Sequence, residues 1–172
     1  MAFCGLIVAL SVTLMLAGGL IPIATYGAPL YAGILLLPIM LEYGKKTAWT
    51  AYAAIVLISL ALCPDKEAAF FFLFFGHYPV LKWQLDRLKS KPVRLALKLL
   101  IYNALFLAMV AVLGYVLGMS AVLDEFRAMG GGMMVSFIVL FNVCMLLYDR
   151  LLAALVVLYV KKLRPRLKFL RN

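Results

Sequence analysis

The sequence contains little of what enzymes and metal sites ordinarily use. Its 172 residues include one histidine, three cysteines and seven acidic residues. Cys4, Cys63 and Cys144 lie far apart and have no cysteine or histidine neighbour at metal-ligand spacing. The chain has no glycine-rich phosphate loop, no His-Glu-x-x-His motif and no paired aspartates within an apolar segment. We therefore expect no enzyme activity, no metal and no cofactor.

Charge is also scarce, and this excludes a water-soluble domain. Charged residues make up 14% of the chain and hydrophobic residues 67%. A soluble protein of this size cannot bury so much apolar surface behind so few charges. The net charge of +10 does not indicate nucleic acid, because the basic residues flank apolar segments instead of forming a stripe on a polar domain. We expect an integral membrane protein whose partner is the lipid bilayer and not nucleic acid.

The apolar segments predict an all-α fold with six transmembrane helices in one compact bundle. A bilayer's hydrocarbon core needs about 20 apolar residues per helix. We read the first segment as a span and not as a cleaved signal peptide, because no basic region precedes it. The whole chain, 1–172, is expected to be a single membrane domain with helices at about 3–23, 28–43, 47–63, 68–82, 93–118 and 133–155.

Lysine and arginine predict the topology. Fourteen of the seventeen lie in three clusters, at 45–46, at 82–98 and in a basic tail at 161–172. These residues collect on the cytoplasmic side of membrane spans. Six spans place all three clusters and both termini on that side, whereas a re-entrant fourth segment would separate them. We therefore expect the short fourth segment to span, and the protein to be a multi-pass cell-membrane protein with both ends inside.

Local signals mark some of the helix ends. Asp65 is expected to cap the fourth helix, and Pro92 suits the first turn of the fifth. Asp149 and Arg150 interrupt an apolar run near the end of the sixth. Either that span ends near Tyr148 and the remainder lies along the inner surface, or a charged pair is buried. We favour the first alternative.

Three polar residues lie within the expected spans. His77 is either a neutral imidazole bonded to a carbonyl or tyrosine, or a functional group at membrane depth. A proton relay through it lacks a partner carboxylate at similar depth. Asn103 and Asn142 bring amides that hydrocarbon cannot satisfy, so they bind each other or nearby backbone. Alternatively Asn142, which is nearer the outer side, contacts a bound solute.

The expected outer loops bring further polar side chains together above the bundle. Converging loops over apolar helices form plausible small-molecule pockets. Most of these loop charges are expected to be solvated loop ends. With His77 and Asn142, the candidate ligand-binding residues are Thr25, Tyr26, Asp65, Glu67, Asp124 and Arg127.

Small residues recur every four positions on the first helix. They are Gly5, Ala9, Thr13 and Ala17. This spacing places them on one narrow face, where small side chains let another helix approach closely. The stripe therefore serves either packing within the chain or docking to a separate membrane subunit.

The chain resembles the substrate-binding S component of energy-coupling factor (ECF) vitamin transporters. The resemblance rests on its six-helix size, its uncharged first outer loop and the small-residue stripe. In that family a small-residue stripe on the first helix contacts a transmembrane coupling subunit, and the matching positions are Gly5, Ala9, Thr13 and Ala17. The resemblance implies a small solute held by the outer loops, import driven by two ATPase subunits, and no catalysis by this chain.

Two other interpretations remain open. The membrane protein of the bacterial rod-shape-determining complex is similar in size and helix count, and it acts as a scaffold without a solute. Its requirements are helix packing and a basic cytoplasmic face. The third interpretation is a small channel or lipid-handling protein.

Overall fold

The computed structural model of the protein describes residues 2–19, 24–116, 118, 124, 128 and 130–165. These residues are helical or lie in turns between helices, and no strand occurs among them, which confirms the all-α fold class. The chain divides into two compact units, one formed by residues 1–84 with 151–172 and the other by residues 85–150. Residues 20–23 of the first expected helix and the basic tail beyond residue 165 lie outside the described residues.

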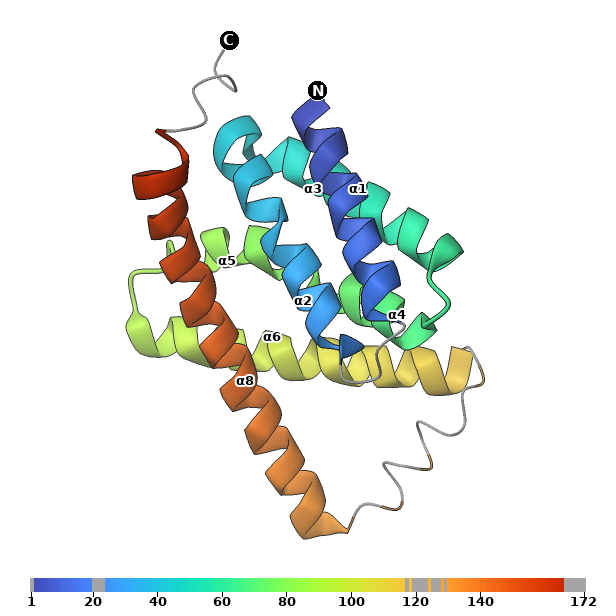
Figure 1. Ribbon diagram of the computed structural model, residues 1–172. Helices are drawn as coiled ribbons and strands as arrows, with labels where there is room; N and C mark the ends of the chain where they lie inside the picture. Colours follow the sequence, from blue (N-terminus) through green and yellow to red (C-terminus); the bar gives the residue numbers. More distant parts are fainter. Residues whose placement is uncertain are drawn as a thin grey trace. The chain divides into compact units, whose positions relative to one another are not determined.

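In the first unit, helix α1 (Ala2–Gly18) packs against α2 (Gly27–Ile34) and α3 (Leu36–Leu62). Figure 1 shows these helices side by side. The packed face of α1 includes Met15, which is fully buried, and Gly18. A Cβ atom added to Gly18 would lie only 2.2 Å from the Cβ of Ala28. The absence of a side chain at Gly18 therefore permits the close approach of α1 and α2.

A glycine breaks α3 at the position where the sequence predicts a turn between two helices. Gly44 has φ +83° and ψ 177°, although the residues on both sides are helical. This conformation is essentially restricted to glycine. The chain changes direction within α3 (Figure 1). The break lies between the helices expected at 28–43 and 47–63.

The next helical segment is divided as well. Helix α4 (Lys66–Phe75) is capped as expected, because the Ala68 amide donates to Asp65 Oδ1 over 3.1 Å. The single helix expected over 68–82 is interrupted by a turn, after which α5 (Tyr78–Leu85) begins. Pro79 explains the interruption, because it has no amide hydrogen to donate to the carbonyl of the preceding turn.

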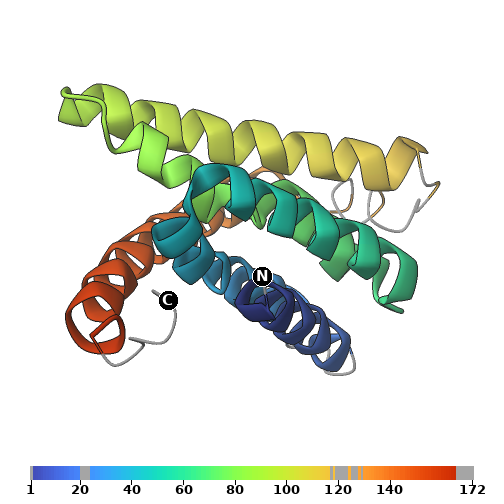
Figure 2. The ribbon, with the colours of Figure 1, turned by 90° about the horizontal axis from the view of Figure 1, so that it is seen from above.

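The second unit contains α6 (Lys91–Ala111) and most of α8 (Gly131–Leu158). Pro92 occupies the first turn of α6, as expected. Both helices end in a π-helical turn, at Val112–Val116 and Tyr159–Leu163 respectively. Figures 1 and 2 show α6 as one uninterrupted rod.

In the part of the chain that the structure describes, two helical segments are long and apolar enough to cross a membrane. They are Lys91–Tyr115, with 25 residues, and Gly131–Lys162, with 32. Helices α2 and α3 meet the same criterion as a pair, although they are bent by 52°. The six-span bundle and the side on which the termini lie stay predictions.

One expectation for the last helix is wrong. Helix α8 continues without a break through Asp149 and Arg150, so it does not end near Tyr148. The reason is that the side chains of Asp149 and Arg150 have different surroundings. The Asp149 side chain is 14% exposed and bonds to Lys98, whereas Arg150 is exposed. Because Asp149 is paired with Lys98, its carboxylate can lie in the middle of an apolar helix.

Candidate functional site

Residues of the first two expected outer loops come together in the first unit. The Tyr26 hydroxyl donates to Glu67 Oε2 over 3.4 Å, although the two residues are 41 positions apart. The Tyr26 ring also meets the Phe71 ring edge-on, with centroids 5.4 Å apart. A phenol, a carboxylate and an apolar ring therefore share one small region. We call Tyr26, Glu67 and Phe71 the rim cluster.

Two further residues predicted for this site lie beside the rim cluster in the sequence. Thr25 precedes Tyr26 and is half-buried. Asp65 is the N-cap residue that precedes α4, two positions before Glu67, and its cap bond fixes its carboxylate. Its Cβ would lie 3.2 Å from a Cβ added to Gly19, which shows that the end of α1 also approaches this region. Asp65 is therefore a positioning residue for the start of α4.

His77 does not belong to the rim cluster. Glu67 lies in the first turn of α4, whereas His77 follows the other end of this helix. The ten residues of α4 span about 15 Å, so the two side chains belong to opposite ends of the helix. Its ring stacks on Trp49 at a centroid distance of 5.8 Å and meets Tyr52 edge-on at 5.7 Å. The Tyr52 hydroxyl donates a hydrogen bond to the Leu73 carbonyl. The His77 side chain also hydrogen-bonds the backbone of Leu73. These contacts correspond to the alternative of an imidazole satisfied within the protein.

Asn142 is fully engaged with Asn103 in the second unit. Asn103 Nδ2 donates to Asn142 Oδ1 over 2.9 Å, and Asn142 Nδ2 donates back to Asn103 Oδ1 over 3.2 Å. Each amide also donates to a carbonyl one turn earlier on its own helix, that of Leu99 or Ile138. The pair forms an interhelical bridge between α6 and α8. Every amide N–H is used, so Asn142 has none to offer a solute.

The two remaining candidates cannot be added to the rim cluster. Asp124 is exposed and belongs to the second unit, whose position relative to the first is not fixed. Arg127 lies outside the described residues. Of the eight residues predicted for ligand binding, the structure brings Tyr26 and Glu67 into direct contact.

The small-residue stripe faces outward from α1. Gly5, Ala9, Thr13 and Ala17 are all exposed. A Cβ atom added to Gly5 would meet nothing within 4 Å. The Thr13 hydroxyl donates to the Ala9 carbonyl over 2.9 Å, so the one polar side chain on this face is satisfied within the helix. Among the described residues of the first unit, these four positions are not buried against another helix.

The sequence reasoning missed a charged cluster in the second unit. Lys98 Nζ lies 2.8 Å from Asp86 Oδ1 and 2.8 Å from Asp149 Oδ2, and its side chain is only 5% exposed. Arg94 adds a longer contact, with Nε 3.9 Å from Asp86 Oδ1. The available signal was a pair of opposite charges, Lys98 and Asp149, each within an otherwise apolar helix. Because Lys98 is counted with the cytoplasmic cluster at 82–98, its pairing with Asp149 is not predicted from the sequence.

A second charged cluster lies in the first unit. Arg164 Nε is 3.0 Å from Glu42 Oε1, and the Tyr159 hydroxyl donates to the same oxygen over 3.4 Å. The Glu42 side chain is 9% exposed. This cluster joins the residues before Gly44 to the end of the last helix.

No group of three or more potential metal ligands occurs among the described residues. Cys4 is half-buried, Cys63 buried and Cys144 exposed, and all three are free thiols. Comparison with known proteins adds nothing to this geometry, since no protein-family model, no curated protein and no solved structure matches the chain.

Proposed function

We propose that this chain is the substrate-capture subunit of an ATP-driven micronutrient importer. It is embedded in the cell membrane with six spans and with both ends in the cytoplasm. It binds a small solute at its outer face and docks through α1 to a transmembrane coupling subunit, which is driven by two ATPase subunits. The chain itself performs binding and transport and no catalysis.

The observation that carries this proposal is the orientation of α1. Its packed face holds residues such as Met15 and Gly18, whereas Ala9 and Ala17 point away from the helices of its own unit. In lipid, small residues favour association because they let helix backbones approach closely. A stripe of small residues that is exposed within its own unit is therefore available to another membrane helix.

The rim cluster supports the capture role. Tyr26 and Glu67 offer a hydroxyl and a carboxylate beside the Phe71 ring. Tyr26 is 52% exposed, so a solute can reach its ring and hydroxyl. Few polar groups above an apolar floor are typical of small-molecule sites. The solute that fits this chemistry has an apolar body and a hydrogen-bonding group.

Docking is tested by purification of the tagged protein from its native membrane, followed by mass spectrometry of the proteins that accompany it. Two ATPases and a membrane coupling subunit are expected with the wild type. Ala9→Leu should lose them, because the larger side chain holds the helix backbones apart. Ala53→Leu is the matched control, since Ala53 is exposed on α3, outside the stripe. It should retain all three partners.

The outcomes separate the two leading functions. Wild-type protein without ATPases overturns the importer, and recovery of cell-wall synthesis proteins in their place supports the scaffold. Retention of the ATPases by Ala9→Leu shows that docking uses another surface. Capture is tested separately by substituting Glu67→Gln, which should reduce binding of a copurified solute while leaving the ATPases in place.

A further inference from the structure

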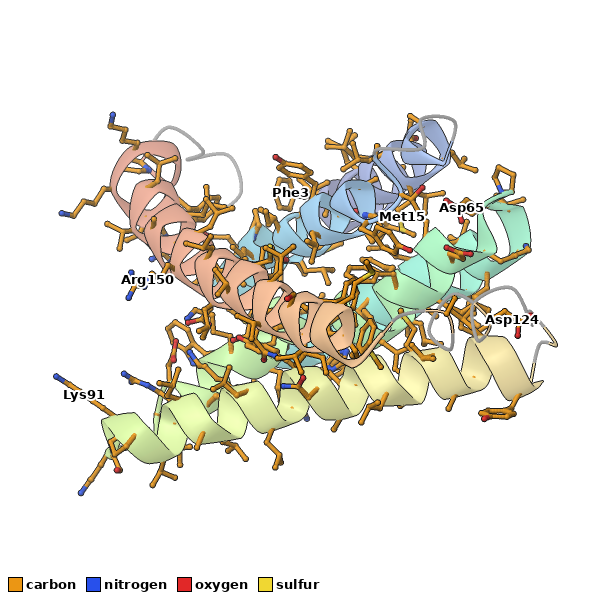
Figure 3. All side chains as sticks on the ribbon, turned by 90° about the horizontal axis from the view of Figure 1, so that it is seen from below. Phe3, Met15, Asp65, Lys91, Asp124 and Arg150 are labelled. Atoms are coloured by element: carbon orange, nitrogen blue, oxygen red, sulfur yellow. The ribbon has the colours of Figure 1, made fainter. Side chains whose placement is uncertain are left out.

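The segment that leads into α6 carries three exposed basic residues. Arg87, Lys89 and Lys91 occupy alternate positions along it. None of them has a carboxylate partner among the residues that the structure describes. Figure 3 shows Lys91 at the beginning of α6, with its side chain directed away from the helix. This segment therefore presents concentrated, uncompensated positive charge.

The neighbouring bases are paired, which makes the contrast informative. Lys98 is neutralised by Asp86 and Asp149, and Arg94 also contacts Asp86. Asp86 precedes Arg87 directly, yet its carboxylate is turned to the buried Lys98 at 2.8 Å. The acidic residue next to the segment is thus engaged by Lys98 and Arg94, although its own side chain is 37% exposed. It anchors the segment to α6 and leaves the three outer charges available to an external anion.

The surroundings of these charges are apolar. Leu88 is 38% exposed, Val93 56% and Leu95 47%. The helix that begins at Lys91 is long and apolar enough to cross a membrane. Exposed aliphatic side chains beside basic ones match the two parts of a phospholipid, its phosphate and its acyl chains. A water-soluble acidic partner would leave these aliphatic side chains unused.

We propose that Arg87, Lys89 and Lys91 form a binding site for the head group of an anionic phospholipid. The phosphate contacts the three cationic side chains, and the acyl chains lie along the apolar surface that begins at Val93. This site is independent of the importer function, because it uses neither α1 nor the rim cluster.

The test measures which lipid lies next to this segment. The reporter is the full chain carrying Trp49→Phe, Trp83→Phe and Leu88→Trp, so that its only tryptophan is in the segment. It is reconstituted in phosphatidylcholine vesicles that contain brominated phosphatidylglycerol or brominated phosphatidylcholine, whose bromine quenches tryptophan at contact. We expect about a tenfold preference for phosphatidylglycerol at low salt, as three exposed ion pairs together supply. Most of this preference should disappear in 1 M NaCl, because the Debye length there is about 3 Å and the charges are screened.

Charge-matched variants assign the preference to the site. Arg87→Gln, Lys89→Gln and Lys91→Gln together should remove it, and each single substitution should reduce it about twofold. The control replaces three bases elsewhere by glutamine, Lys46, Lys161 and Lys162, and should keep the preference. Equal quenching by both lipids in the reporter, an unchanged preference in the first triple variant, or an equal loss in both triple variants would each overturn the proposal. If the triple variant does not fold, the single variants decide by the same comparison.

Discussion

The ammonium nitrogen of Lys98 lies 2.9 Å from one carboxylate oxygen of Asp149 and 2.8 Å from the other. Lys98 belongs to α6 and Asp149 to α8, and both side chains lie within helical segments of membrane-spanning length. Ionisable groups in such segments are costly unless they are paired. The pair therefore ties α6 to α8 at a defined register within the second unit.

Removing one member of this pair should destabilise the protein strongly. We expect Lys98→Met to lower the free energy of unfolding by about 3–5 kcal/mol, because it removes the buried ammonium group that bonds both carboxylate oxygens of Asp149. Titration of the purified protein with a denaturing detergent, followed by circular dichroism, measures the loss. Arg94→Met is the control, since its contact is 3.9 Å long and its side chain 33% exposed. Equal stability of the two variants would contradict a structural role for the Lys98 pair.

The reciprocal bridge between Asn103 and Asn142 predicts energetic coupling. Asn103→Leu and Asn142→Leu should each destabilise the protein, because each leaves the other amide without its partner. The double variant should cost less than the sum of the two. The coupling measured by this cycle should be about 0.6–1.7 kcal/mol, the range of hydrogen bonds between membrane helices. Strict additivity would mean that the two amides act independently.

Two glycines of α1 should respond oppositely to the same substitution. Gly18→Ala places a Cβ 2.2 Å from that of Ala28, so α1 and α2 must separate and the melting temperature should fall. Gly5→Ala meets no atom within 4 Å and should raise the stability of the helix by about 0.5–1 kcal/mol. Thermal unfolding of the two variants in one detergent tests the assignment of the packed and outward faces. A stable Gly18→Ala variant would contradict it.

The turn at Gly44 depends on the absence of a side chain. Its φ of +83° and ψ of 177° are strained for any other residue. We expect Gly44→Ala to cost about 1–3 kcal/mol of folding free energy. Gly27→Ala is the matched control, because Gly27 lacks a positive φ and an added Cβ there has open space. A loss of stability in the control and not in Gly44→Ala would refute the argument.

Local signals in the sequence were sufficient for several features of the fold. The apolar content predicts helices, Asp65 predicts the cap of α4, and the polar stretch after Tyr43 marks the break at Gly44. Each of these depends on residues close together in the chain. The bridge between Asn103 and Asn142 was also foreseen as one alternative, because hydrocarbon leaves an amide few other partners.

Features that depend on distant residues were harder to predict. The continuity of α8 through Asp149 follows from Lys98, which is 51 residues earlier. From the sequence alone, Asp149 is expected to end the last span, because Lys98 is counted with the cytoplasmic cluster at 82–98 and not as its partner. Likewise, His77 attracted attention as the only histidine, although Trp49 and Tyr52 occupy its surroundings. The direction in which the stripe of α1 points also depends on packing that its spacing does not encode.

The contact between Arg164 and Glu42, at 3.0 Å, has a consequence for how the chain is threaded. Side chains joined in this way lie on one side of any bilayer or at the same depth within it. Gly44 is two residues after Glu42, and Arg164 belongs to the basic tail at 161–172. The chain between Glu42 and Arg164 must therefore return to the depth from which it started. This condition comes from one contact between two side chains, and it does not depend on where the lysines and arginines accumulate.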